Sequence, residues 1–390
     1  MGDDELEALR GGLFAEREML AADQEVGFVG GEHMYDDVFS HERTVFGGGE
    51  VASFGLRVDT NRVPSEIKRA IAAQHASAAG ENGSPRGSVA RREMKAAVDD
   101  ALREEARSGR HRRSKLVDLL WLSDERVLLC SAPTDSVVEA LSAHWRAVMG
   151  GALEVRSSAT LAWDWLTKQG RDRDFEDLMP TAFAEPPSAG LASVPEVRWA
   201  FGRGEPKDFL GNEFLLWLWF VCDAGEGEVE HDGDVTAVAF ERVLDVECGW
   251  SVAGKISMSG HEGGIEPVRM PEAKMALALG KLPRKAGLTV ARGGMQWSCV
   301  LQGDRWLVSS GAMMEPEEKF EHARELAEWR VDQTRELERT LRGLFLRFVE
   351  LRTGGDWVGV RDRMRAWIAG QHGARARVVV EMKEGAGAEV

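Results

Sequence analysis

The stretch EVASFGLRVDTNRVPSEIKRAI, residues 50–71, decides the fold class, because its periodicity changes within a few residues. Its first part, Glu50–Asp59, alternates apolar and polar side chains as a half-buried strand does. Thr60 or Asn61 can then cap a helix, and Pro64 lies in a first turn where its missing amide proton costs no hydrogen bond. The sequence therefore predicts a strand that leads directly into a helix.

The residues that follow predict a second helix, which runs back along the first. The run ENGSPRGS, residues 81–88, favours a turn through its Asn-Gly and Ser-Pro pairs. A helix is expected from about residue 89 to 107, and its apolar side chains are few and small, so it can bury only a thin stripe. We expect two antiparallel helices that project as a finger over about residues 64–110.

After Gly109 the pattern returns to strands. The runs KLVDLLWL and RVLLCSA, which Ser123–Glu125 separates, predict a hairpin, and residues 133–148 predict an amphipathic helix. This mixture of hairpins and helices indicates an α+β fold with mixed or antiparallel sheets rather than a doubly wound sheet.

Length and composition allow more than one domain. The chain has 390 residues, of which 43% are hydrophobic, so it can bury two cores. We predict four parts: an α+β domain at 1–155, a connecting segment rich in charge, proline and alanine at 156–206, a second α+β domain with C-terminal helices at 207–372, and a flexible tail at 373–390.

The most hydrophobic segment is KDFLGNEFLLWLWFV, residues 207–221, which predicts a helix at the centre of the second domain. Trp217 and Trp219 are two residues apart and cannot share one helix face. The helix is therefore either surrounded by its own domain or half exposed at a dimer interface, and core packing is the favoured interpretation. Alternating runs between residues 234 and 313 predict the strands of this domain.

The net charge of −16 excludes a protein that coats nucleic acid with its whole surface, because phosphate binding requires cations that face the polyanion. Residues 84–115 nevertheless carry ten Lys and Arg against five Asp and Glu. Arginine suits phosphate because its guanidinium donates two parallel hydrogen bonds. The alternative is a solvated helix face with Glu–Arg pairs. The predicted DNA-binding residues of this segment are Arg91, Arg92, Lys95, Arg107, Arg110, Arg112, Arg113 and Lys115.

A second group of cations, Lys281, Arg284 and Lys285, surrounds Pro283 in the run GKLPRKAGL. A turn that presents three cations can contact a phosphate backbone. The same residues can also offset the dipole at a helix C-terminus. Both interpretations stay open, and we include the three residues in the predicted DNA-binding set.

The sequence contains no motif that is typical of catalysis. The four cysteines form no CxxC pair, the glycine runs do not match a nucleotide-binding loop, and SMSGHEGG lacks the GxSxG elbow. Residues 32–42 gather His and carboxylates without a fixed metal-ligand spacing. We expect no enzyme, no cofactor and no metal. No stretch approaches the roughly 20 apolar residues of a membrane helix, so a cytoplasmic protein without a membrane partner is expected.

Several of these segments occur in the order that is typical of the RdgC family of recombination-associated proteins. Between about residues 25 and 153 the chain contains, in this order, GFVGGEHMYD, FGLRVDTNRVPSEIKRAI, REMKAAVDDALREEA, SGRHRRSK, WLSDERVLLCSAP and SVVEALSAHWRAVMGG. The chain resembles a longer, divergent branch of that family.

The resemblance implies a homodimer shaped like a closed ring, which holds double-stranded DNA in its central hole without sequence specificity. It further implies a nucleoid-associated protein that limits the access of a RecA-type recombinase to DNA. The alternative from another class is an acidic protein-interaction scaffold that does not contact DNA.

Overall fold

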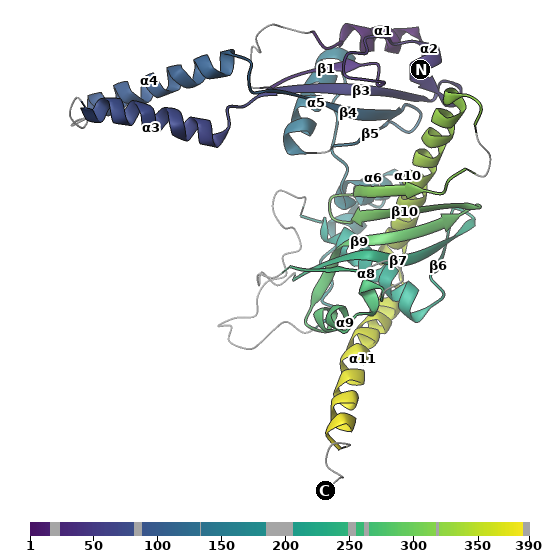
Figure 1. Cartoon of the computed structure of the whole chain (residues 1–390). Coiled ribbons are helices and arrows are strands. Elements are labelled where there is room, and N and C mark those ends of the chain that lie inside the picture. The colour runs from purple at the N-terminus through teal and green to yellow at the C-terminus, as the bar shows by residue number, and fades with distance from the viewer. Residues whose placement is uncertain are drawn as a thin grey trace. The chain divides into compact units, whose positions relative to one another are not determined.

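The computed structural model describes residues 1–15, 24–81, 88–132, 134–184, 206–248, 255–260, 265–316 and 320–384. The chain divides into two compact units. Unit 1 comprises Met1–Glu154 and His322–Asp332, and unit 2 comprises Val155–Glu321 and Gln333–Val390. Each unit combines helices with an antiparallel sheet, which confirms the predicted α+β class (Figure 1).

Unit 1 is built on one sheet in the order β1-β3-β4-β5, with β2 beside β3. All of its strand pairs are antiparallel. Helix α2 (His41–Thr44) and a 3-10 turn (Gly47–Gly49) lie on either side of β2 in the chain. The strands are β1 (Gln24–Val29), β2 (Val45–Phe46), β3 (Val51–Asn61), β4 (Arg112–Leu122) and β5 (Val127–Cys130).

One face of this sheet carries the main core of unit 1. Alternate residues of β3 and β4, among them Phe54 and Val117, pack against helices α1 (Asp3–Gly11) and α5 (Asp135–Met149). Trp145 of α5 meets Trp121 edge to face, with ring centroids 5.1 Å apart. The period-two alternation places these apolar residues on one face of the sheet, while Arg57 and Asp59 of β3 are buried on the other face.

The predicted finger is present as helices α3 (Ser65–Glu81) and α4 (Ser88–Arg107), which lie side by side and project away from the sheet of unit 1 (Figure 1). Ile67, Ile71, Met94 and Val98 are half-buried. No described residue of either helix belongs to one of the three apolar core clusters. The finger thus has the thin apolar interface that its sequence predicts.

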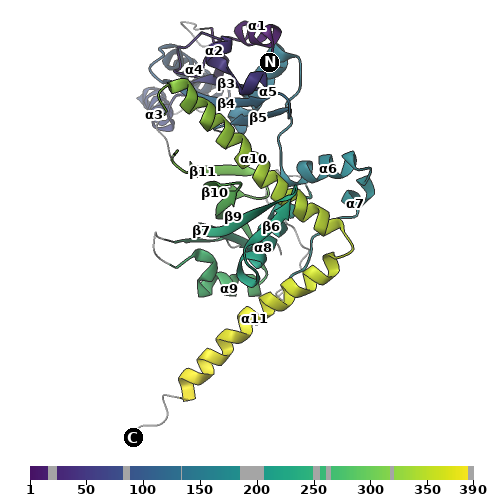
Figure 2. The same cartoon turned by 90° about the vertical axis from the view of Figure 1, so that its right-hand side faces the viewer.

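Unit 2 contains a second antiparallel sheet in the order β11-β10-β9-β7-β6, with β8 paired to β7. Its strands are β6 (Glu228–His231), β7 (Asp234–Cys248), β8 (Ile256–Ser259), β9 (Lys281–Arg292), β10 (Met295–Gln302) and β11 (Leu307–Met313). Its helices are α6 (Ser158–Lys168), α7 (Asp172–Glu176), α8 (Phe209–Ala224), the 3-10 turn Pro267–Arg269, α9 (Pro271–Ala278) and α11 (Trp357–Glu384). Helix α10 (Ala323–Thr353) begins in unit 1 and continues in unit 2, and α11 follows it (Figure 2).

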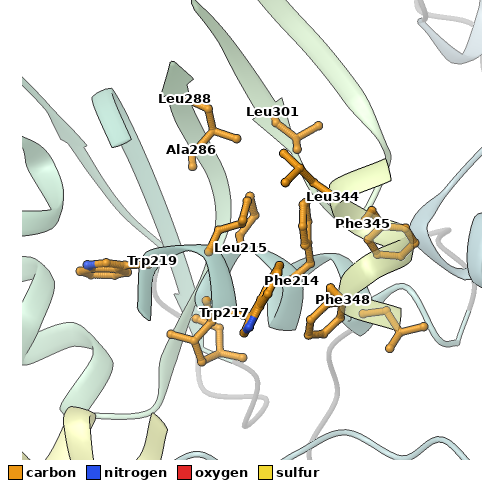
Figure 3. Packing of buried hydrophobic residues seen from close by; sticks show 14 of the residues in the cluster. Phe214, Leu215, Trp217, Trp219, Ala286, Leu288, Leu301, Leu344, Phe345 and Phe348 are labelled. Atoms are coloured by element: carbon orange, nitrogen blue, oxygen red, sulfur yellow. The ribbon is translucent and has the colours of Figure 1, made fainter. Parts of the chain in front are cut away.

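Helix α8 lies at the centre of unit 2, as the sequence predicts. Phe214 packs edge to face against Phe345 of α10, with centroids 5.4 Å apart, and Leu215 lies toward the sheet (Figure 3). Trp217 is 7% exposed and Trp219 is fully buried. Both tryptophans therefore pack in the core of unit 2, which confirms the favoured interpretation over a dimer contact.

One predicted part of the chain needs correction. The segment 156–206 is not only a connection, because α6 and α7 form within it and Leu161, Leu166 and Phe183 belong to the core of unit 2; residues 185–205 lie outside the described part. The backbone of α11 continues to Glu384 and so includes the first residues of the predicted tail, whose flexibility stays a prediction. Residues 385–390 are outside the described part.

Candidate nucleic-acid interface

The base of the finger is held by polar contacts between strand ends and the end of α4. Asn61, the last residue of β3, donates a hydrogen bond from its side-chain amide to the Ala106 carbonyl, at 2.5 Å. Nε2 of His111 lies 2.9 Å from a carboxylate oxygen of Glu105, and both side chains are mostly buried. These contacts orient the C-terminal end of α4 on the sheet.

Arg112 belongs to a buried ion-pair cluster, which corrects its place among the predicted DNA-binding residues. Its guanidinium lies 2.8 Å from the carboxylate of Asp59, a side chain with no exposed surface. Arg57 binds the same carboxylate at 3.0 Å and contacts the ring of Phe14. Burial alone would raise the pKa of Asp59, but hydrogen bonds from Arg57, Ser114 and Arg112 outweigh it and lower the pKa below its usual value.

The next cations of β4, Arg113 and Lys115, lie on the face opposite to Arg112. β4 pairs with β3 over its whole length but with β5 only from Leu119 to Leu122, so in its first half β3 is its one neighbour among the described strands. Because side chains alternate along a strand, Arg113 and Lys115 share one face and Arg112 takes the other. Both Arg113 and Lys115 are exposed.

Further exposed cations extend this surface along the finger. Arg107 ends α4, and Arg110 follows in a turn where Gly109 has φ +70°, a conformation that glycine adopts without strain. The side chain of Arg91 lies outside the described part of the structure. Apart from Arg91 and Arg112, the cations predicted within residues 84–115 are six in number and all are exposed. We define these six as the finger cations: Arg92, Lys95, Arg107, Arg110, Arg113 and Lys115.

The finger also carries acids. Arg103 pairs with Asp100 at 2.7 Å on the surface of α4, as the alternative interpretation of a solvated helix face requires. Glu93 and Glu104 are exposed on the same helix. Counted over residues 62–115, thirteen Lys and Arg nevertheless stand against seven Asp and Glu, so the finger is positive in a chain of charge −16.

Three exposed cations near the base and on α3, namely Arg62, Lys68 and Arg69, are absent from the set predicted from sequence. Arg69 donates to the Ser65 carbonyl of its own helix at 3.4 Å. The closely spaced cations of the sequence begin only after the turn between the two helices, so the fewer cations of the first helix are not part of that run. A charge count over residues 62–115 includes Arg62, Lys68 and Arg69.

The second predicted group, around Pro283, is not a surface turn. Lys281, Arg284 and Lys285 lie on β9, which is paired with β7 on one side and β10 on the other. Arg284 binds Glu247 at 3.0 Å and Asp304 at 2.9 Å, and its side chain is 21% exposed. We therefore correct the prediction: Arg284 holds three chain segments of unit 2 together, and no cationic loop is formed.

Lys281 and Lys285 are half-buried in the same strand. In the register of the sheet Lys285 lies opposite Asp245 of β7 and Gln302 of β10. The carbonyl of Pro283 accepts a hydrogen bond from the side-chain amide of Asn212 at 2.9 Å. These residues are integrated in the sheet, so the cations of β9 are not part of the candidate interface.

Residues 32–42, where the sequence gathers His and carboxylates, form ion pairs in the structure. In the described ranges no group of three or more His, Cys, Asp or Glu is placed to hold a metal ion. Two carboxylates of residues 32–42, Glu32 and Asp36, bind Arg43 at 2.6 and 3.2 Å. Burial raises the pKa of Cys222 to about 12 and that of Cys299 to about 11, which keeps both thiols protonated and unreactive.

No model of a known protein family matches the chain, and no curated protein sequence matches it. Among the described residues there is also no helix whose length and apolarity would let it cross a bilayer.

Proposed function

We propose that the protein binds double-stranded DNA without sequence specificity, through the finger cations. The observation that supports this is the contrast in charge: the finger is positive while the whole chain is strongly acidic. The six finger cations are exposed and lie on one helix, one turn and one strand that follow each other in the chain. Contacts of this kind act on phosphates, which carry no sequence information.

The resemblance to RdgC proteins suggests the cellular role that we propose for this binding. In this role the protein is a homodimer that associates with the nucleoid and modulates recombination by limiting the access of a RecA-type recombinase to DNA. Light scattering at micromolar concentration tests the dimer, because a monomer has a mass of 42.9 kDa. A measured mass near that value would contradict it.

The test of DNA binding is a triple substitution, Arg107→Ala, Arg110→Ala and Arg113→Ala, measured by fluorescence anisotropy with several unrelated duplexes over a salt series. The wild-type protein is expected to bind all duplexes with similar affinity. The variant should bind more weakly, and its slope of log affinity against log salt should be smaller by about one unit for each phosphate that it no longer neutralises. Its stability should change by less than about 0.5 kcal/mol, because the three side chains are exposed.

A matched control removes the same charge from unit 2, by substituting the exposed Arg269, Arg305 and Arg363 with alanine. This control should keep the wild-type affinity and slope. Equal losses in both variants would show that only net charge matters, and no binding by the wild-type protein at low salt would favour the protein-interaction scaffold.

A further inference from the structure

Unit 2 contains a hollow that the DNA-binding proposal does not use. It lies between the turn from β6 to β7, the turn from β9 to β10, and α10. Its volume is about 480 Å³, which is within the range of small-molecule sites. The side chains and backbone that line it belong to Asp232, Asp234, Arg292, Gly293, Met295, Glu336, Arg339, Thr340, Arg342, Gly343 and Leu346.

Glycines give the hollow its shape. Gly293 and Gly294 have φ values of +56° and +81° and form the tight turn after β9. Gly343 lies where α10 approaches the β6–β7 turn, and a Cβ there would stand 2.5 Å from Nδ1 of His231. Helix and turn can therefore come this close only because residue 343 is glycine.

The lining carries both signs of charge. Arg292 binds Asp234 at 3.3 Å, and Arg339 binds Glu336 at 2.9 Å. Asp232 adds a carboxylate whose side chain is 71% exposed. Arg342, on the same helix as Arg339, binds Glu338 at 3.1 Å. The carboxylates would repel a simple anion and the guanidinium groups would repel a simple cation. A ligand that carries both charges can place each of them beside a group of opposite charge.

One polar atom in the lining has no partner among the described residues. The hydroxyl of Thr340 is fully buried and forms no hydrogen bond with any of them. Buried hydroxyl groups are normally hydrogen-bonded, so an isolated one at the wall of a hollow indicates a missing partner. None of the described residues that line the hollow is aromatic, so a ligand that stacks on rings, such as a sugar or a nucleobase, is not favoured.

We propose that this hollow binds a small zwitterion of the free amino acid class. The carboxylate of the ligand lies against Arg339 and Arg342, its ammonium group lies against Asp232, and a polar atom of the ligand accepts or donates a hydrogen bond at Thr340. The site belongs to unit 2 and is independent of the finger cations of unit 1.

Isothermal titration calorimetry of the full chain with each standard free L-amino acid tests the proposal. At least one is expected to bind. Its N-acetyl derivative, which lacks the ammonium group, and its amide, which lacks the carboxylate, should each bind at least about tenfold more weakly. Binding by none of the amino acids, or equal binding by the N-acetyl derivative, would overturn the proposal.

Two substitutions locate the site. Asp232→Asn removes the partner of the ammonium group and should weaken binding about tenfold, while Asp164→Asn, at an exposed position of α6 outside the hollow, should not. Thr340→Val keeps the side-chain shape and removes the isolated hydroxyl, so it should raise the melting temperature without ligand and weaken binding. An amino acid that binds Asp232→Asn and Thr340→Val as tightly as the wild-type protein would place the site elsewhere and refute this assignment.

Discussion

The two basic segments of this chain look alike in sequence and differ in the structure. SGRHRRSK, residues 108–115, lies at the base of the finger, whereas GKLPRKAGL, residues 280–288, forms most of the central strand β9. In the first segment one arginine, Arg112, binds a buried carboxylate, whereas Arg113 and Lys115 are exposed. In the second, Arg284 binds two carboxylates and the two lysines are half-buried.

The two segments differ in which of their cations lie beside a carboxylate. Arg112 lies beside Asp59, although β3 is the one described strand that pairs with this half of β4. Arg284 lies between Glu247 and Asp304. Arg113 and Lys115 are on the face of β4 opposite to Arg112 and are exposed, so a polyanion can reach them.

Among the substitutions that test this difference, Arg284→Ala is expected to have the largest effect. The substitution leaves Glu247 and Asp304, which are 12% and 8% exposed, without the guanidinium between them. We expect a loss of about 3 kcal/mol in the free energy of unfolding, because removing one partner of a mostly buried ion pair leaves the other charges buried without a counter-charge. Urea denaturation followed by tryptophan fluorescence measures it.

Lys285→Ala, one residue further along β9, is the control for this substitution and should cost far less. The affinity of the Arg284→Ala variant for DNA should stay at the wild-type value under conditions where it is folded. A clear drop in DNA affinity with unchanged stability would return Arg284 to the candidate interface.

Arg112→Ala should have a smaller effect on stability. Asp59 keeps its ion pair with Arg57 and loses the one with Arg112, so we expect a loss of about 2 kcal/mol, as is typical of a hydrogen bond to a charged group. The neighbouring Arg113→Ala should behave oppositely, with weaker DNA binding and an unfolding free energy within about 0.5 kcal/mol of the wild-type value. If both variants lose DNA affinity equally, the assignment of their opposite roles is wrong.

The smallest effect concerns the pH dependence of the same cluster. The folded-state pKa of Asp59 is lowered, so the carboxylate contributes stability that is fully present above its unfolded-state pKa and is lost as the pH falls through the folded-state pKa. The difference in unfolding free energy between the wild-type protein and Asp59→Asn should therefore be constant above about pH 5 and shrink below about pH 4. Denaturation curves at a series of pH values measure this difference, and a constant difference down to about pH 2 would contradict the ion-pair role.

The order of elements in unit 1 could be predicted because each has a clear period. The alternation in β3, Pro64 before α3 and the turn residues before α4 mark three boundaries within about forty residues. The same alternation separates Arg113 from Arg112 by face. What it could not supply is the carboxylate of Asp59, which comes from a strand more than fifty residues earlier and is brought beside Arg112 only by the register of the sheet.

Unit 2 shows where local patterns fail. The sequence around Pro283 predicts a turn, but the proline lies in β9 next to a register shift between Asp245 and Val246 of the neighbouring strand. Proline is tolerated in a sheet at such irregularities, and a single sequence does not reveal them. Helix α6 is not predicted either, because proline and charge further along dominate the composition of that segment, although Ser157 and Thr160 have the spacing of a helix cap.

The first half of β4, which has one neighbour among the described strands, affects how separate molecules behave toward each other. A strand without a neighbour on one side presents backbone donors and acceptors to any other extended chain, and this promotes edge-to-edge aggregation. Arg113 and Lys115 lie on that stretch, so two copies that approach through it bring like charges together. The same side chains that are proposed to attract DNA thus also discourage the protein from adding strands to itself.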